Sequence, residues 1–169
     1  LSALRGFENS ELNSSVVFSA GLNPALFSYM ENFKDFFPDS KGNITKRIIL
    51  KVSDYRSALI QGRFLAKKGL WVSEFRIESG LNCGGHAFAT DGILLGPILE
   101  EFKSNRETLN QTLWEACNQT LLAKGKHLLL SDEKVIITVQ GGIGTHIRLT
   151  ERLDCSLTGQ YMMHLGNHL

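Results

Sequence analysis

The sequence has no long apolar run, no excess of either charge and few cysteines. No uninterrupted apolar stretch approaches the roughly 20 residues that a membrane-spanning helix needs, so we expect a soluble protein without a membrane partner. Lys and Arg total 18 against 17 Asp and Glu, a formal net charge of +1, and the two signs are interspersed. Because this balance gives no basic face, we expect no nucleic-acid partner.

The cysteine and histidine spacings exclude two further classes of protein. Cys83, Cys117 and Cys155 are too few and too far apart for a disulfide framework or a zinc site of paired cysteines. The sequence does not open with the basic segment and apolar stretch of a signal peptide. The histidines show no spacing typical of metal ligands. We therefore predict a cytoplasmic protein without a metal.

Short apolar runs alternate with amphipathic stretches along the chain. The runs predicted to be strands are 15–20, 47–52, 71–77 and 134–139, with a weaker candidate at 155–158. Helices are predicted within 24–37, from an N-cap at Ser53-Asp54 to Gly69, and as two segments between 94 and Gly125. This alternation is typical of a parallel sheet covered by helices. We predict an α/β fold with a single domain over residues 1–169.

Five parallel strands would form part of an eight-stranded (β/α)8 barrel, a fold that typically needs about 250 residues. We therefore expect the chain to be a fragment of a longer barrel. Two strand edges and the barrel interior would then be exposed. Pairing with a second copy into a homo-oligomer is one way to cover them.

Ligands of parallel α/β folds bind where the carboxyl ends of the strands meet. Lys51 lies near such an end and interrupts an otherwise apolar strand. It either faces an anionic atom of a ligand or is a strand-end lysine whose ammonium group reaches solvent. Arg76 and Glu78 pose a similar choice: they either pair across neighbouring strands or present their charges to a ligand.

A glycine-rich run, Gly-Gly-Ile-Gly-Thr at 141–145, follows the strand predicted at 134–139. Its backbone N–H groups, with few Cβ atoms in the way, suit a phosphate. Glycine pairs also occur in tight turns that need a positive φ, so a purely structural role stays open.

A second glycine-containing stretch, Asn-Cys-Gly-Gly-His at 82–86, follows the strand predicted at 71–77. His86 is either a general acid or base near neutral pH or a loop histidine that caps a carbonyl group. Cys83, three residues earlier, is either a reactive thiolate or an inert buried thiol.

Several of these stretches resemble the motifs of one family, in the same order and spacing. Residues 82–86 are similar to a Glu-Ala-Gly-Gly-His loop, and 139–143 (Val-Gln-Gly-Gly-Ile) to an Ala-Ala-Gly-Gly-Ile phosphate loop. Residues 153–160 follow a Gly-Ala-Asp-Gly-Val-Gln-Met-Gly-Thr pattern, and 16–22 a Val-Val-Ser-Phe-x-x-Gly strand. These motifs resemble the nitronate monooxygenase and 2-nitropropane dioxygenase-like family, FMN-dependent (β/α)8 barrels that include the flavin type of enoyl-acyl-carrier-protein reductase.

The resemblance implies an FMN-dependent oxidoreductase that acts on a small-molecule substrate, with His86 as its catalytic acid or base. It also implies that the chain corresponds to the later strands of the barrel, with the amino-terminal half missing. Together with the position of Lys51, it predicts that the residues at the cofactor are Lys51, Gly84, Gly85, Gly141, Gly142, Ile143, Gly159 and Gln160. The family loop has an acidic residue and alanine where this chain has Asn82 and Cys83, so the resemblance does not name the substrate.

The residues leave two other functions open. One is a non-catalytic or truncated α/β domain that keeps a phosphate or flavin pocket. The other is thiol chemistry, in which Cys83 is the nucleophile and His86 its base.

Overall fold

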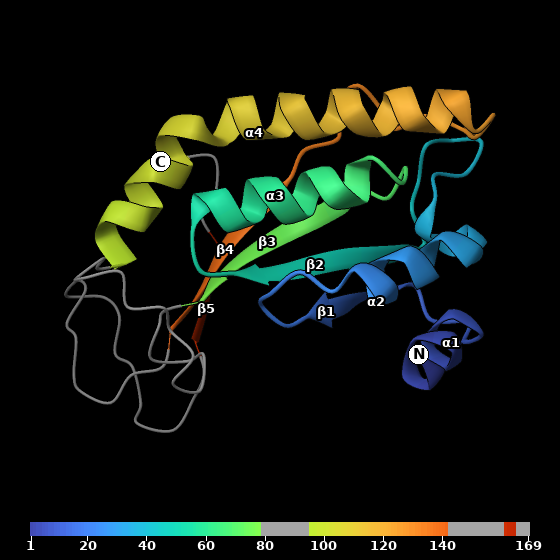
Figure 1. The fold of residues 1–169 in the computed structure, drawn as a ribbon, viewed down its shortest axis with the longest axis horizontal. Coiled ribbons are helices and arrows are strands. Elements are labelled where there is room, and N and C mark those ends of the chain that lie inside the picture. The colour runs from blue at the N-terminus through green and yellow to red at the C-terminus, as the bar shows by residue number, and fades with distance from the viewer. Residues whose placement is uncertain (79–94, 142–160, 165–169) are drawn as a thin grey trace.

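A computed structural model describes residues 1–78 and 95–141, together with the backbone of a strand at 161–164 (Figure 1). This part of the chain forms one five-stranded sheet in the order β1-β2-β3-β4-β5. The strands are β1 (Ser14–Phe18), β2 (Lys46–Val52), β3 (Val72–Glu78), β4 (Ile136–Gly141) and β5 (Tyr161–His164). The first four are parallel and alternate with helices, which confirms the predicted α/β fold.

The last strand differs from the sequence prediction. β5 pairs antiparallel with β4, whereas the weaker candidate at 155–158 lies outside the described residues. A short strand that follows a long polar and glycine-containing segment carries little periodicity of its own, so no pattern in the sequence indicated it.

The helices are α1 (Ser2–Glu8), α2 (Pro24–Tyr29), α3 (Tyr55–Ala66) and α4 (Leu95–Ala123), with 3₁₀ turns η1 (Met30–Asn32) and η2 (Lys34–Phe36). The prediction of two helical segments after β3 is wrong, because α4 is a single helix of 29 residues. The polar stretch 103–108 contains neither Gly nor Pro, so it continues the helix while Phe102 and Leu109 stay buried on either side. None of the described helices is long and apolar enough to cross a bilayer.

The apolar core lies between the sheet and the helices. One row of the register, Phe18, Leu50, Phe75 and Ile137, crosses the four parallel strands, and all four side chains are buried. In Figure 1, α3 and α4 lie side by side over this face of the sheet. Each buried Leu, Ile or Phe contributes about 1.5–3 kcal/mol to folding, so this row is a main source of stability.

Glycines allow the close packing of this layer. A Cβ on Gly62 in α3 would lie 2.8 Å from Cδ1 of Leu113 in α4, so a larger residue would push the two helices apart. Gly69, with φ of +76°, ends the turn after α3 in a conformation that favours glycine, as the sequence predicted.

Asp54 is the predicted N-cap of α3. Its Oδ1 accepts a hydrogen bond of 2.6 Å from the backbone N–H of Ser57. Burial acts to raise the pKa of Asp54, but hydrogen bonds from Ser57 and Ser53 outweigh it and hold the pKa below its ordinary value. A lowered pKa means that the charged form stabilises the folded state.

We expect Asp54→Ala to lower the free energy of unfolding by about 1 kcal/mol at neutral pH, the usual effect of losing an N-cap. The contribution of the charge is complete above the ordinary pKa of 3.8 and is lost as the pH falls through the lower folded value. Urea unfolding of the variant and the parent at neutral and acidic pH measures this. Equal stability at neutral pH would contradict the capping role, and exposed Asp132→Ala is the control.

A buried lysine connects the amino-terminal segment to the sheet. Lys46, the first residue of β2, is only 1% exposed. Its Nζ donates to the carbonyl oxygens of Phe7, Ser10 and Leu12 at 3.1, 2.7 and 2.6 Å, and lies 4.7 Å from the centre of the Phe7 ring. Lys46 therefore donates to carbonyl groups in the last turn of α1 and in the segment after it, and fixes this segment against β2.

Replacing Lys46 with Met should lower the free energy of unfolding by about 2 kcal/mol, because three carbonyl oxygens would lose hydrogen bonds from this buried donor. Chemical denaturation of the full chain measures the effect. Lys67→Met, at an exposed position after α3, is the matched control and should be close to neutral. If both variants unfolded at the parent's denaturant concentration, Lys46 would have no such role.

Candidate functional site

The face of the sheet opposite the helices carries polar and charged side chains near the carboxyl ends of three strands. Parallel register places Lys51 of β2 beside Arg76 of β3, and Arg76 beside Thr138 of β4. Two residues further toward the carboxyl ends, Glu78 of β3 lies beside Gln140 of β4 in register. We call this group the carboxyl-end cluster; its members are Lys51, Glu74, Arg76, Glu78, Thr138 and Gln140.

Lys51 and Glu78 form an ion pair between neighbouring strands. Their Nζ and Oε1 atoms are 2.8 Å apart, with the Lys51 side chain 25% exposed and that of Glu78 5% exposed. The sequence left open whether Glu78 pairs with a neighbouring strand or presents its charge to a ligand. In the structure it pairs with Lys51 of the neighbouring strand. An ammonium group has three N–H donors, and within the described residues the Lys51 ammonium bonds to Glu78 alone. Lys51 can therefore donate to a ligand without leaving Glu78.

Glu74 fixes two other members of the cluster. Its Oε1 accepts hydrogen bonds from Nε of Arg76, at 3.0 Å, and from the hydroxyl group of Thr138, at 2.6 Å, and it forms an ion pair with Nη2 of Arg76 at 2.9 Å. Arg76 thus pairs within its own strand rather than with a neighbouring one. Side chains with this many short contacts are held in one orientation, so this part of the face is rigid.

The charges of the cluster compensate one another. Lys51 and Arg76 are neighbours in register, and like charges directly opposite each other destabilise a sheet. Each cation has a carboxylate within 3 Å, Glu78 for Lys51 and Glu74 for Arg76. The cluster is therefore neutral in sum, and Lys51, the most exposed of the four charges, is the cation that an incoming ligand would meet.

Sequence reasoning identified Lys51, Arg76 and Glu78 but missed Glu74, Thr138 and Gln140. A signal for Glu74 was present, because Glu74, Arg76 and Glu78 alternate with apolar residues along β3 and so share one face. Thr138 could not be assigned to the cluster without the register of β4 against β3.

Both motif-bearing segments start at this end of the sheet. Residues 79–94 follow Glu78 of β3 and lead to α4, while residues 142–160 follow Gly141 of β4. Because Glu78 and Gln140 are neighbours in register, the two segments leave from adjacent points. Gly141 pairs with Tyr161, so the second segment also returns to this edge.

The structure places some of the predicted site residues and not others. Lys51 belongs to the carboxyl-end cluster, and Gly141 is the last residue of β4. The other predicted site residues lie outside the described part of the chain: His86, Gly84, Gly85, Gly142, Ile143, Gly159 and Gln160, and with them Cys83. Within the described residues, no group of three or more His, Cys, Asp or Glu could hold a metal ion.

Comparisons with known proteins do not assign this chain to a family. No family model matches it, and neither a curated protein nor a solved structure does so significantly.

Cys117 of α4 is not a candidate nucleophile. It is fully buried, and this burial raises the pKa of its thiol to about 12. At neutral pH the thiol is protonated, and only the thiolate is reactive.

We therefore expect Cys117 to resist alkylation by iodoacetamide at neutral pH in the folded protein and to react in denaturant. Mass spectrometry of the peptide that contains Cys117 measures both. Modification at the same rate in the two conditions would contradict its burial in the core.

Proposed function

We propose that the chain is an FMN-dependent oxidoreductase similar to nitronate monooxygenases, with its ligand at the carboxyl ends of β2, β3 and β4. The observation that carries this proposal is the adjacency of the two motif-bearing segments. The stretches 82–86 and 139–143 are far apart in sequence. The first comes after β3, the second begins in the last residues of β4, and these two parallel strands are neighbours in the sheet. Lys51 of β2 lies at the same edge.

The fold proposed for this function is a (β/α)8 barrel to which β1–β4 contribute consecutive strands. Three observations support it: the parallel strands follow one another in sequence order, the core helices pack on one face, and the other face carries paired charges of low exposure. A barrel has its helices outside and a packed interior. The antiparallel β5 is not one of the eight strands in this proposal. Closure needs further strands, from a longer polypeptide or a second copy.

The residues present suit a flavin phosphate and ring. Backbone N–H groups of Gly141, Gly142, Ile143 and Gly159 would bind the phosphate. Gly84 and Gly85 would leave room for the ring or the substrate, and Gln160 would lie beside the cofactor.

The Lys51 ammonium, oriented by Glu78 at 2.8 Å, would donate to an anionic or carbonyl oxygen of the cofactor. When bound, FMN would supply the electron transfer, and the protein would position its reactive atom against the substrate. His86 would hold or remove a proton of the substrate.

FMN binding tests the location of the site. We expect saturable quenching of FMN fluorescence by the full chain, and about tenfold weaker binding for Lys51→Met, because a charge-assisted hydrogen bond is lost. Lys134→Met is the matched control: Lys134 is exposed just before β4, at the opposite end of the sheet, and its loss should leave the affinity unchanged.

Lys51→Met also removes the ion pair with Glu78, so the double variant Lys51→Met/Glu78→Gln separates binding from folding. It should fold like the parent and still bind FMN weakly. Absence of FMN binding by the folded parent would refute the flavin proposal. Parent-like affinity of both Lys51 variants would remove Lys51 from the site.

The role of His86 has its own test. We expect His86→Ala to retain FMN but to turn over a short-chain alkyl nitronate about 10²–10⁴-fold more slowly, as is typical for loss of a general acid or base. Oxygen consumption measures the rate. An unchanged rate would show that His86 takes no part in the reaction.

A further inference from the structure

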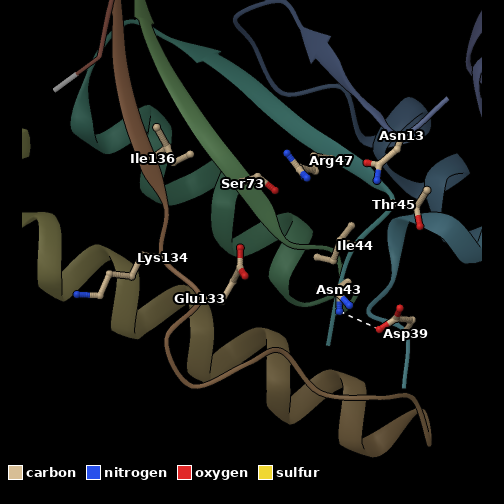
Figure 2. Close-up of a pocket in the computed structure, with 10 residues that line it drawn as sticks. All are labelled: Asn13, Asp39, Asn43, Ile44, Thr45, Arg47, Ser73, Glu133, Lys134 and Ile136. Carbon is tan, nitrogen blue, oxygen red and sulfur yellow. Dashed lines mark hydrogen bonds between the residues drawn. The ribbon is translucent and has the colours of Figure 1, made fainter. Parts of the chain in front are cut away.

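A cavity lies at the amino-terminal end of the strands, opposite the carboxyl-end cluster and on the same face of the sheet (Figure 2). Its volume is about 490 Å³, within the range of small-molecule sites. Residues of β2, β3 and β4 line it together with the loops that precede β1, β2 and β4. Most of these side chains are polar, so the cavity suits a small polar molecule.

Two opposite charges face this cavity without neutralising each other. Arg47 of β2 makes no hydrogen bond or ion pair in the part of the chain that the structure describes, and Glu133 makes no ion pair there. The carboxyl-end cluster is different, since each of its charges has a partner of opposite sign within 3 Å. Among the charged residues of the cavity, Arg47 and Glu133 are thus a cation and an anion that a bound molecule could pair with.

The environment of Glu133 favours a cationic partner. Burial raises the pKa of Glu133; the indole of Trp71 opposes this shift, Asp132 adds to it, and Arg47 opposes it. An ammonium group bound at Glu133 would stabilise the charged carboxylate. Figure 2 shows the Glu133 carboxylate directed toward the side of the cavity where Arg47 and Ser73 lie, whereas the Lys134 side chain extends away from them.

An irregularity in β3 brings a hydroxyl group to the same wall. The register of β2 against β3 shifts here: Ile48 pairs with Val72 and Ile49 with Glu74, so Ser73 has no partner in register. Ser73 is one of the residues that line the cavity. Bulges of this kind redirect side chains and are frequent beside binding sites.

Asp39, a second carboxylate that lines the cavity, is already engaged in internal hydrogen bonds. Asp39 accepts hydrogen bonds from the backbone N–H groups of Lys41 and Asn43, at 2.8 and 2.9 Å. Its carboxylate therefore competes poorly for a ligand, which leaves Glu133 as the acceptor for a cation and Arg47 as the donor for an anion.

We propose that this cavity binds a small zwitterion of the amino-acid class, with its carboxylate on Arg47 and its ammonium group on Glu133. Guanidinium and carboxylate groups match in geometry and form paired hydrogen bonds. The site is separate from the proposed flavin edge and does not depend on it.

Thermal unfolding and isothermal titration calorimetry of the full chain with each common free amino acid, one at a time, test the proposal. A ligand of the folded state raises the unfolding temperature. We expect at least one amino acid to bind and to raise this temperature, while acetate and methylamine, which each carry one of the two charges, do not.

Variants locate the site. Glu133→Gln and Arg47→Met should each weaken binding about tenfold or more. Arg47→Lys should also weaken binding, because lysine lacks the planar guanidinium group. This variant keeps the positive charge, so it serves as the test if Arg47→Met does not fold. Lys67→Met, at an exposed position after α3, should bind like the parent. The proposal is overturned if no free amino acid binds, if acetate binds as well as the amino acid, or if binding survives in the folded Glu133 and Arg47 variants.

Discussion

The parallel register of β2, β3 and β4 is the constraint on which the rest of the structure depends. One row of this register, Leu50, Phe75 and Ile137, lies in the core under α3 and α4. The next row, Lys51, Arg76 and Thr138, lies on the opposite face. Since side chains alternate along a strand, a slip of one residue would move charges into the core and apolar groups out of it. The burial of the core row therefore also fixes the neighbours of the charged row.

Charge compensation divides the second face into two ends. Near the carboxyl ends, Glu78 and Glu74 neutralise Lys51 and Arg76, so two adjacent cations are compatible with a stable sheet. Near the amino-terminal ends, Arg47 and Glu133 face a cavity and form no ion pair with each other. The first arrangement holds groups in place beside the segments that carry the glycine motifs. The second leaves charges available, which is why a different ligand is proposed there.

Local patterns predicted most of the described fold. The apolar runs of β1–β4 and the Asp54 N-cap are local features, and a single sequence contains them. The single helix α4 was missed because its polar middle resembles a break when only one apolar face is followed. Contacts between residues far apart in sequence could not be predicted. The hydrogen bond of Thr138 to Glu74 depends on strand register, and the hydrogen bond of Lys46 to the segment after α1 depends on how α1 packs. Of the candidate site, the sequence singled out Lys51, Arg76 and Glu78, and the sheet shows which segments start side by side.

Amide hydrogen exchange of the full chain with and without FMN tests the proposal that FMN binds at the carboxyl ends of β2–β4. We expect slower exchange on FMN addition at the carboxyl ends of β2, β3 and β4 and in peptides from residues 79–94 and 142–160. Protection confined to the opposite end of the sheet, in residues 39–47 and 133–136, or no protection at any peptide, would contradict it.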